Sequence, residues 1–88
     1  MAAPALFTRI EKLLLENGWE KTWEDPGGQR WEKDSDAHYW RYWQLTINFM
    51  PDGNHYCKLY YGSSLKEPET TCHLRSLRPV LKHRRLIR

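Results

Sequence analysis

The chain has 88 residues and a mass of 10.7 kDa, so it forms one domain at most. Its longest uninterrupted apolar runs are three residues long, as at Leu13–Leu15, which excludes a membrane-spanning helix of ~20 residues. Five Trp, five Tyr and two Phe exclude a wholly disordered chain and predict a core built largely from aromatic rings.

Residues 4–17 predict an amphipathic helix, with apolar side chains at helical spacing on one side: Leu6, Ile10, Leu13 and Leu14. The opposite, polar side carries mainly Arg9, Glu11, Lys12 and Glu16. Gly18 marks the end of the helix, since glycine readily adopts the left-handed conformation required there.

Residues 19–33 predict a β-hairpin that turns at Asp25–Gly28, where proline fixes φ and glycine supplies positive φ. Alternation along the outgoing strand places three side chains on one side: Trp19, Lys21 and Trp23. The return strand is centred on Trp31. No signal for a helix interrupts this segment.

Residues 39–50 predict the longest strand, and residues 55–61 its antiparallel partner after a turn at Pro51–Asn54. The inner face is expected to carry Trp43, Leu45, Ile47, Phe49, Cys57, Leu59 and Tyr61. The outer face is expected to carry Tyr56, Lys58 and Tyr60.

Near the C-terminus, Thr70 or Thr71 is the expected cap of a short basic helix with Leu74, Leu77 and Leu81 on its apolar side. Pro79 either ends that helix near Arg78 or starts a new one. We therefore expect an α+β fold, with an N-terminal helix on an antiparallel sheet of about four strands in two hairpins. Residues 1–79 form its compact domain. Residues 80–88 form a basic tail that ends in a dangling apolar tip, Leu86–Ile87.

Charge is segregated along the sequence. Residues 1–72 carry 8 basic and 11 acidic side chains, whereas residues 73–88 carry six basic side chains and no acidic one. The two segments therefore have formal charges of −3 and +6, which give the net charge of +3. The six C-terminal cations are Arg75, Arg78, Lys82, Arg84, Arg85 and Arg88. Such a cluster favours nucleic-acid phosphates. It could instead pair with the acidic residues between 20 and 36, remain solvated, or bind an acidic protein or a membrane surface.

Aromatic side chains are expected on the outer face of the two long strands, namely Trp40, Tyr42, Tyr56 and Tyr60. Exposed rings on a sheet stack on unpaired bases or anchor a protein partner. The alternative is that the C-terminal helix or the first hairpin covers them.

Metal and catalytic sites are poorly supported. His55, Cys57, Cys72 and His73 contain zinc-ligand types, but the usual Cys-x₂₋₄-Cys spacing is absent, so we expect no metal and no cofactor. A Cys57–His55 or His38–Asp36 pair is the only catalytic pairing suggested by the sequence. Two cysteines and no secretory signal predict free thiols and a cytoplasmic location.

These features together predict a small non-enzymatic binding module. Its expected partner is DNA or RNA, or a nucleic-acid-processing protein, reached through the basic C-terminal segment and the aromatic sheet face. The alternative is a protein–protein interaction module, such as an inhibitor or adaptor of a phage or mobile element. The sequence indicates neither the oligomeric state nor a preference for DNA over RNA.

Overall fold

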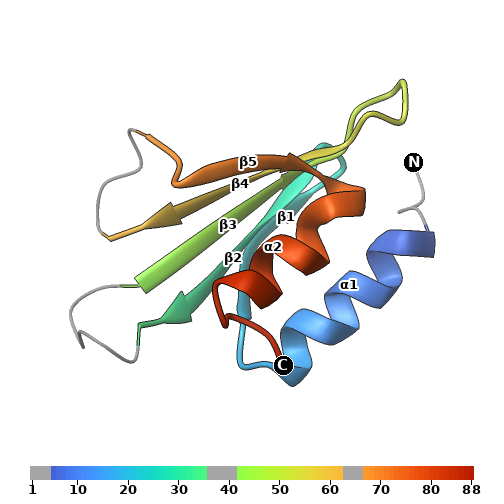
Figure 1. Ribbon diagram of the computed structural model, residues 1–88. Coiled ribbons are helices and arrows are strands. Elements are labelled where there is room, and N and C mark those ends of the chain that lie inside the picture. Colours follow the sequence, from blue (N-terminus) through green and yellow to red (C-terminus); the bar gives the residue numbers. More distant parts are fainter. Residues whose placement is uncertain (1–4, 36–41, 63–66) are drawn as a thin grey trace.

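A computed structural model describes residues 5–35, 42–62 and 67–88, and Figure 1 shows its arrangement. The α+β class is confirmed, but the sheet has five strands rather than about four. The elements in chain order are α1 (Ala5–Glu16), β1 (Glu20–Asp25), β2 (Gly28–Asp34), β3 (Tyr42–Asn48), β4 (Tyr56–Tyr61), β5 (Thr70–His73), the 3₁₀ helix η1 (Leu74–Ser76) and α2 (Leu77–His83).

The sheet is an antiparallel meander in which each strand pairs with the next, in the order β1-β2-β3-β4-β5. Both helices lie side by side on one face of this sheet (Figure 1). We call the face under the helices the inner face and the opposite one the outer face. No helix of the described residues covers the outer face, so the molecule has two layers.

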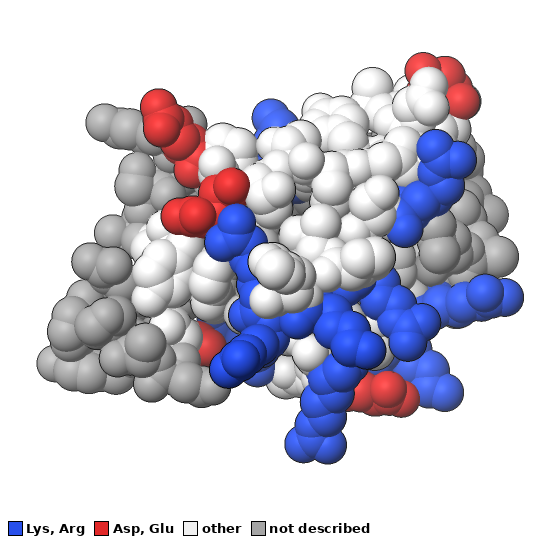
Figure 2. Space-filling model, in the orientation of Figure 1, with Lys and Arg blue, Asp and Glu red and all other residues white. Residues whose placement is uncertain are grey.

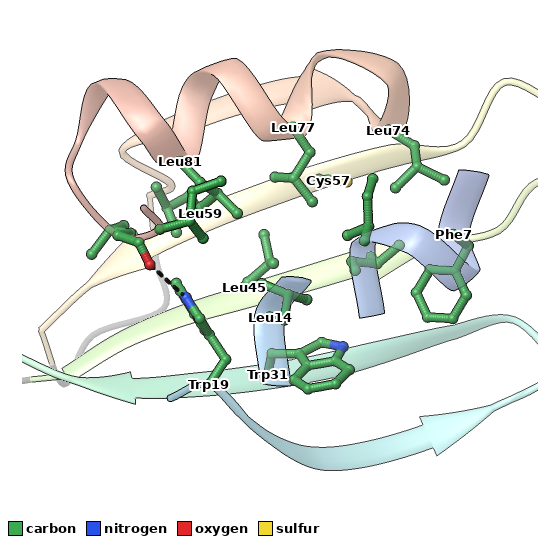
Figure 3. Packing of buried hydrophobic residues seen from close by; sticks show 14 residues of the cluster. Phe7, Leu14, Trp19, Trp31, Leu45, Cys57, Leu59, Leu74, Leu77 and Leu81 are labelled. Atoms are coloured by element: carbon green, nitrogen blue, oxygen red, sulfur yellow. Dashed lines mark hydrogen bonds between the residues drawn. The ribbon is translucent and has the colours of Figure 1, made fainter. Parts of the chain in front are cut away.

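The core lies between the helices and the inner face. Leu45 and Leu59 face each other across β3 and β4, beneath Leu77 and Leu81 of α2 (Figure 3). The expectation of a core built largely from rings is wrong, because leucines and isoleucines fill most of it. Its buried aromatic members are Phe7, Trp19 and Trp31. The chain can use aliphatic side chains because its C-terminal segment supplies so many of them.

Trp31 is the largest fully buried side chain, and its polar edge is satisfied. Its indole Nε1 donates to Gln29 Oε1 at 2.8 Å, and the Gln29 amide nitrogen donates in turn to Glu24 Oε2. A buried indole N–H without an acceptor would be costly. Gln29, itself only 4% exposed, therefore allows a tryptophan to sit in the centre of the core.

The first hairpin differs from its prediction at two points. A β-bulge between Lys21 and Trp23 shifts the register, so Lys21 stays on the inner face and Trp23 turns to the outer face. The turn itself forms without positive φ at Gly27 or Gly28. Gly28 is needed instead for close approach, because a Cβ there would lie 2.4 Å from the Ile47 carbonyl oxygen.

The predicted cap at Thr70 or Thr71 is also wrong, because these residues begin β5, which pairs with β4. The chain leaves β5 at His73, whose side-chain Nδ1 accepts the Arg75 N–H and caps η1. Pro79 does not end the helix. It is the third residue of α2, in the first turn, where the missing N–H has no intrahelical partner to lose.

The C-terminal residues belong to the core rather than to a separate tail. The boundary expected after residue 79 falls inside α2, and Leu86 and Ile87 are each 6% exposed rather than dangling. Trp19 Nε1 donates to the Leu86 carbonyl oxygen at 3.0 Å (Figure 3), and the Arg88 N–H donates to Asn17 Oδ1 at 2.8 Å. These two hydrogen bonds hold the C-terminal residues 86–88 against the residues that follow α1.

Candidate nucleic-acid interface

Exposed cations from both helices gather on the helical side of the molecule. Figure 2 shows that most of the blue side chains visible on this side lie over the two helices, with red groups among and beside them. We define the basic helical face by six exposed residues: Arg9, Lys12, Arg75, Arg78, Lys82 and Arg85. Arg75, Arg78 and Lys82 follow one another at three- and four-residue spacing, so they form one stripe opposite the buried leucines.

The two helices meet at an open groove of about 550 Å³. Arg9 and Lys12 of α1 line it together with Arg75 and Arg78 from η1 and α2. Its remaining lining residues are Ile10, Leu13, Glu16 and Pro79. The groove is therefore rimmed by four cations and one carboxylate. The contribution of α1 was not predicted, because only the folded arrangement brings its cations beside those of the C-terminal segment.

Intramolecular pairing does not neutralise this face. Among the described residues, Arg84 Nη1 lies 3.5 Å from Glu69 Oε2 and Lys21 Nζ lies 2.9 Å from Glu24 Oε2, and these are the ion pairs found there. Arg84, one of the six predicted cations, is thus partly engaged. Arg88 is exposed beside the end of α1. Within the described part of the chain, no C-terminal cation pairs with the acidic side chains of β1 and β2.

Arg85 has an unusual backbone conformation, because it is the one described non-glycine residue with positive φ, at 58°. It occupies the left-handed position of a Schellman motif, in which Leu86 N–H bonds to the Leu81 carbonyl and Arg85 N–H to the Lys82 carbonyl. The end of α1 has the same motif, with Gly18 at φ 83°. Helix α1 therefore ends with glycine, the residue that this conformation favours, whereas α2 ends with Arg85. The positive φ of Arg85 lowers the stability of the fold by about 1 kcal/mol.

The predicted aromatic surface lies on the opposite side of the sheet. Register places Tyr42, Tyr56 and Tyr60 on the outer face, because their neighbours Trp43, Cys57 and Leu59 are on the inner one. Trp40 lies outside the described residues. Neither helix covers these tyrosines. The basic helical face and the aromatic surface therefore cannot both contact one short, straight ligand.

The bulge in β1 adds Trp23 to the outer face, where its side chain is 48% exposed. Two described cations of this face lie beside rings, with Arg30 Cζ 6.0 Å from the centre of the Trp23 ring and Lys58 Nζ 5.7 Å from that of Tyr56. Sequence alternation missed Trp23, because a bulge leaves no clear signal in the pattern. The outer face is thus an aromatic surface with cations beside two of its rings.

The structure places the described members of the suggested metal and catalytic sets on different faces of the sheet or engages them in other hydrogen bonds. Cys57 faces inward whereas His73 pairs with outward-facing Tyr56, and the Nδ1 atoms of His55 and His73 accept backbone N–H groups of Met50 and Arg75. Within residues 5–35, 42–62 and 67–88, no cluster of three His, Cys, Asp or Glu side chains suits a metal ion. Burial raises the pKa of the Cys57 thiol, which opposes formation of the nucleophilic thiolate. His38 and Asp36 lie outside the described residues.

No protein-family model, curated protein sequence or solved structure matches this chain. None of the helices in the described ranges is long and apolar enough to cross a lipid bilayer. The function therefore has to be inferred from the geometry and charge of the two faces.

Proposed function

We propose that this protein is a small non-enzymatic module that binds nucleic acid through the basic helical face. The observation that carries this proposal is the meeting of Arg9 and Lys12 with Arg75 and Arg78 around one groove. These four side chains come from opposite ends of the chain, and none of them has a carboxylate partner among the described residues. Exposed cations that outnumber the one carboxylate beside them form a surface that polyanions favour.

The driving force for binding is the release of counterions from the phosphate backbone. The logarithm of the binding constant falls as the logarithm of the salt concentration rises. Each phosphate neutralised by a cation makes this slope more negative by about 0.9 for a duplex and about 0.7 for a single strand. Four of the six cations are arginines, and the guanidinium fork can hold two phosphate oxygens at once. Binding is accordingly expected to be tight at low salt and to weaken steeply as salt rises.

The direct test is fluorescence anisotropy with labelled single- and double-stranded DNA and RNA between about 50 and 200 mM salt. We expect saturable binding to at least one of these ligands, with a log–log slope corresponding to about four to six phosphate contacts. No saturable binding at the lowest salt, or an affinity that does not change with salt, would rule out this function.

Arg85→Gly separates the contribution of this side chain to binding from its contribution to stability. Glycine relieves the positive φ, so we expect the free energy of unfolding to rise by about 1 kcal/mol, measured by chemical denaturation. At the same time one phosphate contact is lost, so affinity at about 0.1 M salt should fall roughly five- to tenfold.

Gly18→Ala is the matched control, because Gly18 holds the equivalent position at the end of α1. We expect this variant to lose about 1 kcal/mol of stability and to keep its affinity for nucleic acid. If Arg85→Gly binds as tightly as the wild-type protein, Arg85 contacts no phosphate.

A protein partner is the second candidate function, and the outer face favours it. Trp23, Tyr42, Tyr56 and Tyr60 present partly exposed rings on the outer face of the sheet, which neither described helix covers. Tryptophan and tyrosine are enriched at protein interfaces. An inhibitor or adaptor role, as in phages and mobile elements, fits this surface, and the cytoplasm is the expected location. A stoichiometric protein partner lost on Trp23→Ser, with nucleic-acid binding unchanged, would support it.

A further inference from the structure

Two cysteines from different strands lie directly opposite each other in the sheet. Cys57 of β4 pairs in register with Cys72 of β5, and both side chains belong to the inner face. Each thiol affects the pKa of the other, so the two side chains lie close together. The proposed binding function uses neither sulfur atom.

The strand pairing places the backbones at a distance that suits a disulfide. The Leu74 N–H bonds to the His55 carbonyl oxygen at 3.0 Å, so that pair is of the hydrogen-bonded type. Pair types alternate along an antiparallel ladder, and Cys57–Cys72 lies two residues further on, so it is of the same type. Its Cα atoms are then about 5.5 Å apart, near the most common Cα separation of disulfides.

We propose that Cys57 and Cys72 form a redox-sensitive dithiol that closes to an intramolecular cross-strand disulfide when the protein meets a peroxide. Cys72 is the entry point, because it is half-buried whereas Cys57 is only 1% exposed. Cys57 is the resolving thiol, held in contact with Cys72 by the strand pairing. The inference is independent of nucleic-acid binding.

The reaction balances with one peroxide. The Cys72 thiolate attacks a peroxide oxygen, so that an S–O bond forms, the O–O bond breaks and the leaving hydroxide takes up a proton to become water. The Cys57 sulfur then attacks the Cys72 sulfenic acid, so that the S–S bond forms, the S–O bond breaks and a second water leaves with the Cys57 proton. Two thiols are oxidised and one peroxide is reduced to two waters.

Solvent access and acidity set the rate of this reaction. Burial raises the pKa of the Cys72 thiol, and the hydrogen bond with Cys57 lowers it by a smaller amount. Because the pKa of Cys72 is raised, little of its thiol is ionised near neutral pH, and the thiolate is the form that reacts with peroxide. Oxidation should therefore be slow near neutrality and faster in alkaline solution. The thiols remain reduced in ordinary reducing conditions and respond only to an oxidative challenge.

The test treats the native full-length protein with hydrogen peroxide and measures intact mass and melting temperature with and without reductant. We expect a mass decrease equal to two hydrogen atoms, reversed by reductant. The melting temperature should rise by roughly 10–20 °C, because the disulfide closes a loop of about 15 residues. Cys72→Ser should show neither change.

Three results would overturn the proposal. They are addition of oxygen to the cysteines without loss of hydrogen, a disulfide that joins two chains, or a disulfide that lowers the melting temperature. The wild-type comparison with and without reductant decides between these outcomes even if the serine variant is unstable.

Discussion

Arg75→Gln with Arg78→Gln should lower affinity for nucleic acid by about 10- to 100-fold at 0.1 M salt, the largest expected effect on binding. These two arginines line the α1–α2 groove opposite Arg9 and Lys12, so their loss removes half of its cationic rim. The slope of log K against log salt should become shallower by about 1.4 to 1.8. Both residues are exposed and make no ion pair with a described carboxylate, so the melting temperature should stay near that of the wild type.

Arg30→Gln with Lys58→Gln is the matched control. It removes the same charge from the outer face, where each cation lies over a ring. Losing these contacts costs about 0.5–1 kcal/mol each at an exposed site, so the protein should stay folded. If both double variants lose affinity equally, net charge drives the binding and the helical face has no special role.

Deleting residues 86–88 should unfold the protein, the largest expected effect on stability. Leu86 and Ile87 each contribute ~2–5 kcal/mol by burial, and Trp19 loses the carbonyl that accepts its indole N–H. The whole domain is expected to have only ~4–13 kcal/mol of stability. Circular dichroism and denaturation should therefore show a largely unfolded chain.

Deleting Arg88 alone is the control for that truncation, because its side chain is exposed and the buried residues remain. It should cost ~0.5–1.5 kcal/mol through the lost bond to Asn17 Oδ1. A folded chain lacking residues 86–88 would show that the C-terminal segment is an appendage. Truncation therefore cannot test binding here, since it removes core residues together with cations.

The parts of the fold that depend on local pattern were predictable from the sequence. Helix α1 and its end at Gly18 follow from helical spacing and from glycine's tolerance of positive φ. The inward and outward residues of β3 and β4 follow from strict alternation. In both cases the signal lies within a dozen consecutive residues.

Other features depend on contacts between distant residues and could not be predicted in this way. Strand β5 is only four residues long and is defined by its pairing with β4 rather than by its own composition. The burial of Leu86 depends on a bond to Trp19, which lies 67 residues away. The sequence of the C-terminal segment, basic residues followed by Leu86 and Ile87, does not show whether the segment is free in solvent or packed against the core.

The part of the candidate site that lies within one short segment was predictable, whereas the part that depends on contacts between distant segments was not. Charge counting located Arg75, Arg78 and Lys82 because they are close together in the sequence. The sequence did not assign Arg9 and Lys12, because their role arises only when α1 lies beside α2. The sequence also left open how the basic segment and the aromatic residues lie relative to each other, whereas the fold puts them on opposite sides of the sheet.

The arrangement of the two faces predicts which residues a bound nucleic acid contacts. An NMR titration with a short oligonucleotide reports on the backbone amide of each residue, so it distinguishes the helical side from the outer sheet face. We expect the largest, salt-sensitive shift changes at residues 9–12 and 75–85, with the amides around Tyr56 and Tyr60 nearly unchanged. Shift changes centred on the outer strands, or none at saturating oligonucleotide, would contradict the assignment of binding to the basic helical face.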